Sequence, residues 1–428
     1  MIDSGHSSLM KPNKPILLLL YPLFIWLIAA VFYCHQYILR VSISPVANAL
    51  MHGFKIDAVT LSFVAASFFY AYIIVQIFAG LIVERYGLKL SIIISTSLCG
   101  VGSLLMAEAT AVSTLFLGRI LIGAGAAFAL LLAVVIIRLH FSKKIFPILN
   151  GLTISLGTVG GFLGGAPLAF YLTETSWRHV MWVAAIISFV LLLFGVLFIR
   201  RGKRVPNAQA DQRAHKGWSE TFHLFAQVIR TKQVWLAGVF SGFICLPLVV
   251  FSGLWGTPFL HAEYQDSSVF IRLGLSMIFI GYGIGAPLLG WLSDIFPLRR
   301  VMRLFALLGF CASLALIYWR PESIYLLFAV IFVLGFCIGA AILSMSYVKQ
   351  HVSLEASPIA FSLVIMMISL SGAVALPVVG DILQAQAGGH WLHGVELFSV
   401  SDYHWALALI PAAFFVSFIL SLFLVKTE

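Results

Sequence analysis

The clearest shortage in this chain of 428 residues is charge. Asp, Glu, Lys and Arg make up only 10% of the sequence, against about a quarter in an average soluble domain. Hydrophobic residues make up 61%, where a soluble domain has roughly half. A soluble core does not absorb this much apolar surface, so the composition excludes an ordinary soluble fold.

The sequence also lacks the motifs of several protein classes. All five cysteines lie inside apolar stretches, with no CxxC pair, so we expect no disulfide framework, no metal site and no cofactor. No HExxH motif, no paired acids inside the apolar stretches and no Ser–His pair at helical spacing is present, which argues against a membrane-embedded enzyme. No phosphate-binding glycine loop followed by Lys-Ser/Thr occurs, so an ATP-driven pump is disfavoured. A sensor is disfavoured as well, because nothing longer than the central loop is available as an output domain.

The chain instead contains twelve apolar stretches of about the ~20 residues that cross a bilayer. They lie at residues 16–37, 59–81, 90–109, 113–137, 148–171, 179–199, 234–256, 272–292, 302–318, 324–346, 358–383 and 403–425. Because lipid offers no hydrogen-bond partner to an open backbone, each stretch must be a helix. The sequence therefore predicts an all-α membrane protein with twelve transmembrane helices.

The positive charges gather on one side of this predicted topology. If the N-terminus is cytoplasmic, 20 of the 26 Lys and Arg residues fall in inner loops and tails. The positive-inside rule then places both chain ends in the cytoplasm. The net charge of +10 is explained by this distribution, so we expect the lipid bilayer, and no nucleic acid, as a partner.

A short turn occurs twice, 210 residues apart. The first copy reads GLIVERYGLKL from Gly80 to Leu90, and the second reads GWLSDIFPLRR from Gly290 to Arg300. At the shared offset Gly80 is matched by Gly290, Glu84 by Asp294 and Lys89 by Arg299. The repeat predicts two six-helix bundles related by a pseudo-two-fold axis. We expect a cytoplasmic tail at 1–15, the bundles at 16–199 and 234–425, and a cytoplasmic loop at 200–233, in which WSETFHLFAQVIR forms an amphipathic helix.

With its repeat, the first turn resembles the signature between helices two and three of the major facilitator superfamily. Glu84 stands where Asp is usual, and Ile295 and Pro297 replace the usual Arg and Gly of the second copy. LGRILIGAGAA in the fourth span and SWRHV before the sixth resemble the family at the matching places. The resemblance covers essentially the whole chain.

The resemblance implies a transporter whose substrate site lies between the halves. YCHQYILRVSISPVANAL, FFYAYIIVQIFAGL and SGLWGTPFL are similar to the phagosomal nutrient transporters of intracellular bacteria, which are implied to import amino acids or nucleosides. The Arg-Val-Ser pattern also resembles proton symporters of organic anions and sugar acids. We expect import of a small polar or anionic solute, with protons, by a monomer in a bacterial inner membrane. The alternative is proton-driven export of drugs or siderophores.

The two turns are implied to form a cytoplasmic latch that closes in one state and opens in the other. Its members are Gly80, Glu84, Arg85, Lys89, Gly290, Asp294, Arg299 and Arg300. The two glycines are expected to let helices approach closely. The alternative is a pair of turns whose charges only orient the loops.

Two arginines in apolar helices are the leading candidates for substrate binding. An Arg such as Arg119, six residues into its span, costs at least ~2.5 kcal/mol on insertion scales unless it faces the protein interior. We interpret it as a site for a substrate anion or for proton coupling; the alternative is a structural Arg bonded to a neighbouring helix. Arg40 at the end of the first helix has the planar fork that suits a carboxylate; its alternative is a side chain reaching the outer interface.

Other polar side chains share helical faces with these arginines. Tyr37 and Gln36 lie on the stripe of Arg40, and Tyr72 and Gln76 are one turn apart on the second helix, so all four are candidates for the substrate site. The charge of a histidine can change near neutral pH, so His35 is, with Arg119, a candidate for proton coupling. Its alternative is a hydrogen-bonded structural histidine. Because Asp and Glu are nearly absent from the spans, facilitated diffusion stays open. Trp255 and Tyr282 are weaker candidates from the second half.

Overall fold

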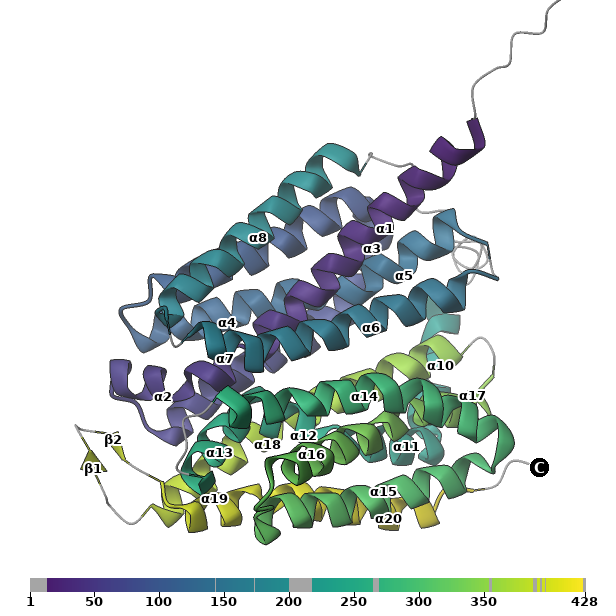
Figure 1. Ribbon diagram of the computed structural model, residues 1–428. Helices are drawn as coiled ribbons and strands as arrows, with labels where there is room; N and C mark the ends of the chain where they lie inside the picture. Colours follow the sequence, from purple (N-terminus) through teal and green to yellow (C-terminus); the bar gives the residue numbers. More distant parts are fainter. Residues whose placement is uncertain are drawn as a thin grey trace, which may run out of the picture.

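The computed structural model describes residues 14–142, 144–172, 174–199, 218–264, 269–353, 356–387, 391–392, 395–396 and 398–425. Almost all of them belong to helices that run along one elongated bundle (Figure 1). Residues 1–13 of the predicted tail and 200–217 of the predicted central loop lie outside the described residues.

The described residues of the first half form eight helices, and some neighbouring helices belong to the same span. They are α1 (Lys14–Val41), α2 (Ile43–Phe54), α3 (Ala58–Ala107), α4 (Val112–Ala126), α5 (Ala129–His140), α6 (Phe146–Gly164), α7 (Ala166–Tyr171) and α8 (Trp177–Phe198). The break between α6 and α7 falls at Gly165, two residues before Pro167. A proline removes a backbone donor and bends a helix.

The second half is more interrupted and includes two π-helical turns. Its helices are α10 (Trp218–Arg230), α11 (Lys232–Ile244), α12 (Leu246–Val249), η1 (Phe251–Trp255), α13 (Gly256–Tyr264), α14 (Val269–Ile295), α15 (Leu298–Leu314), η2 (Ala315–Trp319), α16 (Ile324–Ile338), η3 (Gly339–Ile342), α17 (Leu343–Lys349), α18 (Ser357–Gln386), α19 (Val400–Leu407) and α20 (Leu409–Leu422). Two two-residue strands, β1 (Trp391–Leu392) and β2 (Val395–Glu396), pair antiparallel. The amphipathic segment WSETFHLFAQVIR is helical over its full length, as α10.

The predicted number of membrane spans agrees with the fold. Within the described residues, eleven helices are long and apolar enough to cross a membrane, and a twelfth results when α11 and α12–α13 count as one span bent by 43°. The predicted end of this seventh span at residue 256 is wrong, because the helix continues to Tyr264. Pro247 and the π-helical η1 bend the helix there without ending it.

The first of the two repeated turns lies inside α3 and separates two spans, Ala58–Gly80 and Arg85–Ala107. Gly87 interrupts this helix with φ 80° and ψ 170°. A side chain disfavours positive φ, whereas glycine adopts it readily. The glycine thus reverses the chain without a loop, at the position where the sequence predicts a turn.

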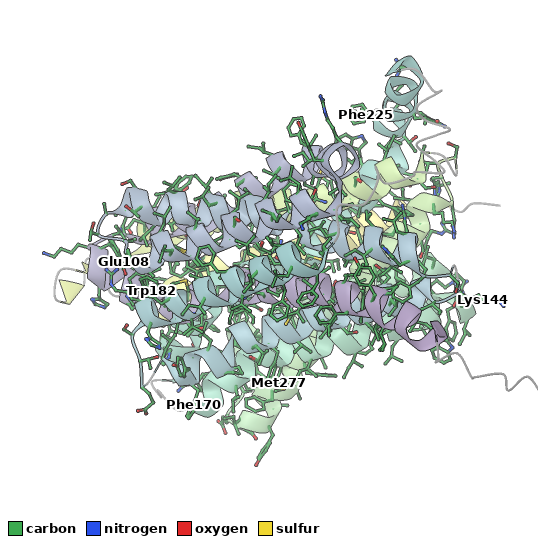
Figure 2. All side chains as sticks on the ribbon, turned by 90° about the horizontal axis from the view of Figure 1, so that it is seen from above. Glu108, Lys144, Phe170, Trp182, Phe225 and Met277 are labelled. Atoms are coloured by element: carbon green, nitrogen blue, oxygen red, sulfur yellow. The ribbon has the colours of Figure 1, made fainter. Side chains whose placement is uncertain are left out.

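Figure 1 shows the two halves one above the other, from purple to teal and from green to yellow. The start of α1, helix α10 and the end of α20 lie at one end, here named the terminal end. Helices α2 and α13 lie at the other, here named the opposite end. In Figure 2, Lys144 marks the terminal end, and Glu108 and Trp182 mark the opposite end. The Trp182 indole donates a 2.8 Å hydrogen bond to Glu108 Oε1 there.

Candidate functional site

A cavity lies between the two halves, about midway along the helices. The cavity has a volume of about 180 Å³, and residues of both halves line it. The first half contributes Tyr33, Tyr37, Arg40, Val41, Ala65, Phe69, Tyr72, Arg119, Leu130 and Ile154. The second half contributes Cys245, Leu248, Val249, Gly253, Phe279, Tyr282, Ala341, Ile342, Met345, Ile365, Ile368, Ser369 and Leu376. Such a mostly apolar wall with a few polar groups is typical of ligand sites.

Arg40 is surrounded by aromatic rings on this wall. Its Cζ lies 4.9 to 5.6 Å from the ring centroids of Tyr37, Phe68, Phe69 and Tyr72, which is cation–π distance. Its Nε is buried and has no hydrogen-bond partner among the described residues. The chain continues beyond it as α2, and the structure places Arg40 on the cavity wall.

Arg119 reaches the same region from α4. The residue is 1% exposed and one guanidinium nitrogen, Nη1, donates a 2.9 Å hydrogen bond to the carbonyl oxygen of Leu39. Its Cζ lies 5.0 Å from the ring centroid of Phe68. The Nε is buried without a hydrogen-bond partner within the described part of the chain. Arg119 therefore has both a structural bond to the neighbouring helix and a free donor beside the cavity.

The two arginines give the cavity a positive charge. Both guanidinium carbons lie within 5.5 Å of the Phe68 ring centroid. The described residues that line the cavity include no Asp or Glu. Since buried charges need partners, two cations without a lining carboxylate form a site that attracts an anion. The phenol groups of Tyr33, Tyr37, Tyr72 and Tyr282 line the same cavity and can donate or accept hydrogen bonds.

Three residues expected from the sequence do not line this cavity. Gln36 and Gln76 each have a buried Oε1 without a partner among the described residues, but neither belongs to the cavity wall. On α1 the lining positions are 33, 37, 40 and 41, so Gln36 falls on the edge of that face. Gln76 is one turn beyond Tyr72 towards the terminal end. His35 packs against α8, with its Nε2 2.8 Å from Ser188 Oγ.

Sequence reasoning missed most of the second-half lining. Of the two weaker candidates from this half, Tyr282 lines the cavity. Trp255 is buried but does not belong to the cavity wall. Cys245, Phe279 and Met345 gave no signal, because apolar residues are the rule in every span. Their placement depends on how the two halves meet.

The halves are joined by hydrogen bonds on the side of the cavity towards the opposite end. Ser44 Oγ donates to the carbonyl oxygen of Leu254 at 3.0 Å and lies 3.0 Å from Thr257 Oγ1. Ser276 Oγ donates to the carbonyl oxygen of Phe162 at 3.1 Å. Level with the cavity, the Tyr70 hydroxyl donates to the Ala373 carbonyl oxygen at 2.8 Å. These contacts close the opposite end.

The same two halves separate towards the terminal end. A Cβ added to Gly283 of α14 would lie 3.0 Å from Thr158 Oγ1 of α6, so the helices touch there. Seven residues farther towards the terminal end, on the same face of each helix, a Cβ added to Gly151 or Gly290 would meet no described atom of another element within 4 Å. The cavity is therefore closed at one end of the molecule, and the helices diverge at the other.

Comparison with known proteins identifies the family. The sequence model of the Major Facilitator Superfamily matches residues 25–271 and 250–428. The chain belongs to the major facilitator superfamily. Multidrug resistance protein 1 of Bacillus subtilis (strain 168) is 26% identical over 179 residues, which cover 42% of this chain and 46% of that protein. The mouse solute carrier family 2 facilitated glucose transporter member 10 is 25% identical over 336 residues, covering 74% of this chain and 59% of the relative. The chain thus spans about half the length of these relatives.

Solved structures of the superfamily share the fold. A bacterial homologue of the human lysosomal transporter Spinster, in an inward-facing and unoccupied conformation, matches with a TM-score of 0.76 at 18% identity, covering 96% of this chain and 98% of that one. The nucleoside transporter NupG matches with a TM-score of 0.71 at 16% identity, covering 95% and 100%. These neighbours are transporters and not enzymes, which agrees with the absence of enzyme motifs in the sequence.

The repeated superfamily turns contact their own halves in this conformation. Lys89 Nζ donates to the carbonyl oxygen of Val196 at 2.6 Å, and Arg299 Nη1 donates to that of Leu424 at 2.9 Å. Among described side chains, no ion pair joins one turn to the other. Arg85, Asp294 and Arg300 are exposed; the Glu84 side chain lies outside the described structure. The expected close helix approach at Gly80 and Gly290 is not seen among the described residues, where a Cβ added to either glycine would meet nothing within 4 Å. The halves diverge at this end.

Proposed function

We propose that this superfamily member is a secondary active transporter that moves a small anionic solute across the membrane by alternating access. The cavity between the halves supports this proposal, because it is closed at one end while the helices diverge at the other. Amino acids, nucleosides and organic acids are the substrate classes expected from the sequence. The positive lining favours organic acids among them.

The observation that carries the proposal is the pair Arg40 and Arg119 on a wall whose described residues include no carboxylate. An arginine fork binds a carboxylate through two parallel hydrogen bonds. The ammonium group of an amino acid finds no carboxylate partner on the described wall. A cationic drug would meet two like charges, so the same pair argues against the exporter alternative.

We further propose import into the cytoplasm of a bacterial cell by a monomer in the inner membrane. Its support is the distribution of Lys and Arg, which favours a cytoplasmic terminal end. With that orientation the conformation is inward-facing. Proton coupling through Arg119 and His35 stays a prediction. His35 contacts Ser188 of α8 and does not line the cavity. A proton bound to His35 would therefore act through the packing of α1 on α8.

The test is a panel of ligands measured for thermal stabilisation of the purified protein, followed by uptake into proteoliposomes. Binding to the folded state raises stability by mass action. We expect organic acids to stabilise the parent protein and to lose this effect in Arg40→Gln and Arg119→Gln. Stabilisation by large cationic drugs or siderophores alone would establish the exporter alternative and overturn the proposal.

A further inference from the structure

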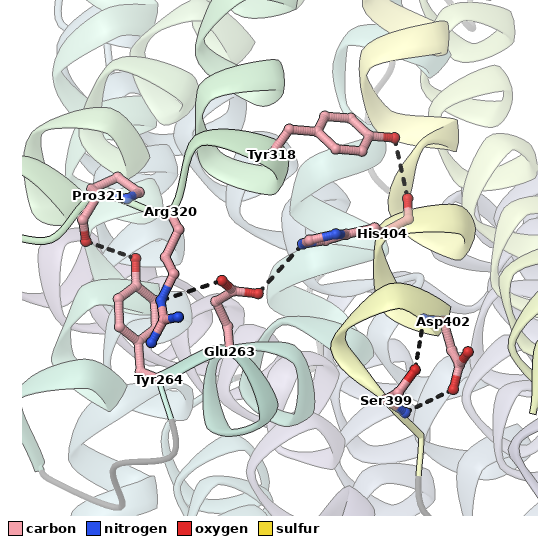
Figure 3. Close-up of polar contacts among 8 residues, drawn as sticks. All are labelled: Glu263, Tyr264, Tyr318, Arg320, Pro321, Ser399, Asp402 and His404. Carbon is pink, nitrogen blue, oxygen red and sulfur yellow. Dashed lines mark hydrogen bonds and ion pairs between the residues drawn. The ribbon is translucent and has the colours of Figure 1, made fainter. Parts of the chain in front are cut away.

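A second polar cluster lies at the opposite end, outside the cavity, and joins three segments of the second half (Figure 3). Glu263 of α13 is only 7% exposed. Its Oε1 lies 3.5 Å from Nε of Arg320, in the turn after η2, and its Oε2 lies 3.3 Å from Nε2 of His404 in α19. A buried carboxylate needs cationic partners. Of these two, only Arg320 is charged at every physiological pH.

The partners of Glu263 are held in place by further contacts. The Tyr264 hydroxyl donates to the carbonyl oxygen of Pro321 at 3.1 Å, which fixes the turn that carries Arg320. The Tyr318 hydroxyl donates to the carbonyl oxygen of His404 at 3.3 Å, and the two rings lie 5.5 Å apart. Figure 3 shows Glu263 between Arg320 and the His404 ring, so the carboxylate bridges α13, η2 and α19.

The other titratable groups near the cluster are identifiable. The described segments that meet there carry His261 and Tyr264 on α13, Tyr318 and Arg320 around η2, and Asp402, Tyr403 and His404 on α19. The Asp402 carboxylate accepts a 2.7 Å hydrogen bond from the backbone N–H of Ser399 at the start of α19. Helices α2 and α18 pack against α13 and α19 and carry His52 and Asp381. Within the described part of the chain, neither residue forms an ion pair with Glu263. Of the two described partners in ion-pair distance of Glu263, His404 is the one that is charged only when it is protonated.

Helix α13 links this cluster to the closure between the halves. Thr257, near its start, lies 3.0 Å from Ser44 Oγ of α2 in the other half. Glu263, near its end, meets Arg320 and His404 in its own half. The span is bent by 43° between α11 and α12, and the π-helical η1 directly precedes α13; such turns are frequent at functional sites. A bent span of this kind lets α13 move as a unit when the contacts at its two ends are released.

We propose that Glu263 and His404 form a proton-binding site that holds α13 in its closed position at the opposite end. Protonation of His404 gives the buried carboxylate a second cationic partner. Proton uptake therefore favours the closed opposite end, and by reciprocity closure favours proton uptake. Stabilisation of the closed end is present when His404 is protonated and is lost when the proton leaves. The site would make opening of that end respond to protons independently of the substrate cavity.

The test measures opening of the opposite end in the full-length protein in lipid nanodiscs, without substrate. Spin labels on Asn48→Cys of α2 and Ser323→Cys before α16, both exposed positions, report the distance between the halves once the native cysteines are replaced. We expect the ratio of closed to open molecules to fall about fivefold or more from pH 5.5 to pH 8. A fivefold change is the lower limit of typical coupling between linked sites. His404→Gln and Glu263→Gln should each remove this pH dependence.

His52→Gln is the matched control, because His52 is an exposed histidine at the same end without an ion pair to Glu263. It should leave the pH dependence unchanged. A parent-like pH response in His404→Gln would overturn the proposal. So would a parent protein whose distances do not change with pH, even if both variants lower the melting temperature, because the cluster would then be a structural ion pair only. If Glu263→Gln does not fold, His404→Gln decides. Since no substrate is used, failure of the proposed transport function leaves this result intact.

Discussion

Lys89 and Arg299, which are 210 residues apart, make the same contact in the two halves of the molecule. Each lies in a repeated turn and donates to a backbone carbonyl near the end of the last span of its own half, Val196 for Lys89 and Leu424 for Arg299. A cation is favourable at a helix C-terminus because the last carbonyls lack partners and the helix dipole is negative there. The repeat in the sequence therefore corresponds to a repeated capping contact.

This equivalence predicts similar losses for Lys89→Met and Arg299→Met. Each variant should lower the free energy of unfolding by roughly 0.5–1.5 kcal/mol, the net value of a typical hydrogen bond, which thermal melts in one detergent would measure. Arg85→Met is the control, since Arg85 is exposed and its described contact is with the neighbouring Tyr86 ring. A large loss in only one of the two variants would contradict the equivalence.

Much of the fold is predictable from the sequence, because a bilayer imposes length and composition on each span. The turn at Gly87 and helix α10 were also predicted, from the glycine and charge pattern and from an amphipathic pattern. The seventh span was predicted to end too early, since polar residues from Thr257 onwards resemble a loop. That error placed Glu263 outside the membrane helix and hid its cluster with His404, which only the packing of α13 on α19 brings together.

The candidate site was predictable only in its polar part. Arg40 and Arg119 stand out because a charge in an apolar helix is costly. Tyr37 and Tyr72 were predicted from helical spacing, and both line the same cavity wall as Arg40. Gln76 fails because the spacing gives the face of a helix but not the depth of the cavity along it. The lining residues of the second half, such as Phe279, are chemically like their lipid-facing neighbours, and their role depends on how the halves meet.

Arg40→Lys is expected to bind the substrate anion about tenfold more weakly or worse. Lysine keeps the charge but loses the fork and the planar contact with four aromatic rings, and a hydrogen bond to a charged group is worth roughly 1.5–3 kcal/mol. The thermal shift by the best ligand of the panel and the KM of uptake would measure this. Arg178→Lys is the matched control, because Arg178, like Arg40, lies over an aromatic ring, but outside the cavity. Full binding by Arg40→Lys would exclude bidentate recognition.

Substitution of two glycines of α6 should have different effects on the conformation. A Cβ at Gly161 would overlap the Phe279 ring of the other half, whereas Gly151 has nothing within 4 Å. Gly161→Val should therefore destabilise the closed opposite end by roughly 1–3 kcal/mol, the cost of overpacking, and Gly151→Val should leave this conformation unchanged. The distance between spin labels on Asn48→Cys and Ser323→Cys, with the native cysteines replaced, should lengthen only in Gly161→Val. Equal distances in both variants would contradict the proposed closure.

The role of His35 is decided by separating accumulation from exchange. If proton movement depends on His35, His35→Gln should still equilibrate the substrate down its own gradient, but should no longer accumulate it when a pH gradient is imposed on proteoliposomes. His179→Gln is the control, because His179 is an exposed histidine of α8 outside the cavity wall. Glutamine can keep a hydrogen bond to Ser188 in place of the histidine, so a folding defect is not expected, and melting temperatures would check this. If His35→Gln accumulates substrate as the parent does, His35 is a structural partner of α8, and the coupling proton is bound elsewhere or is not used.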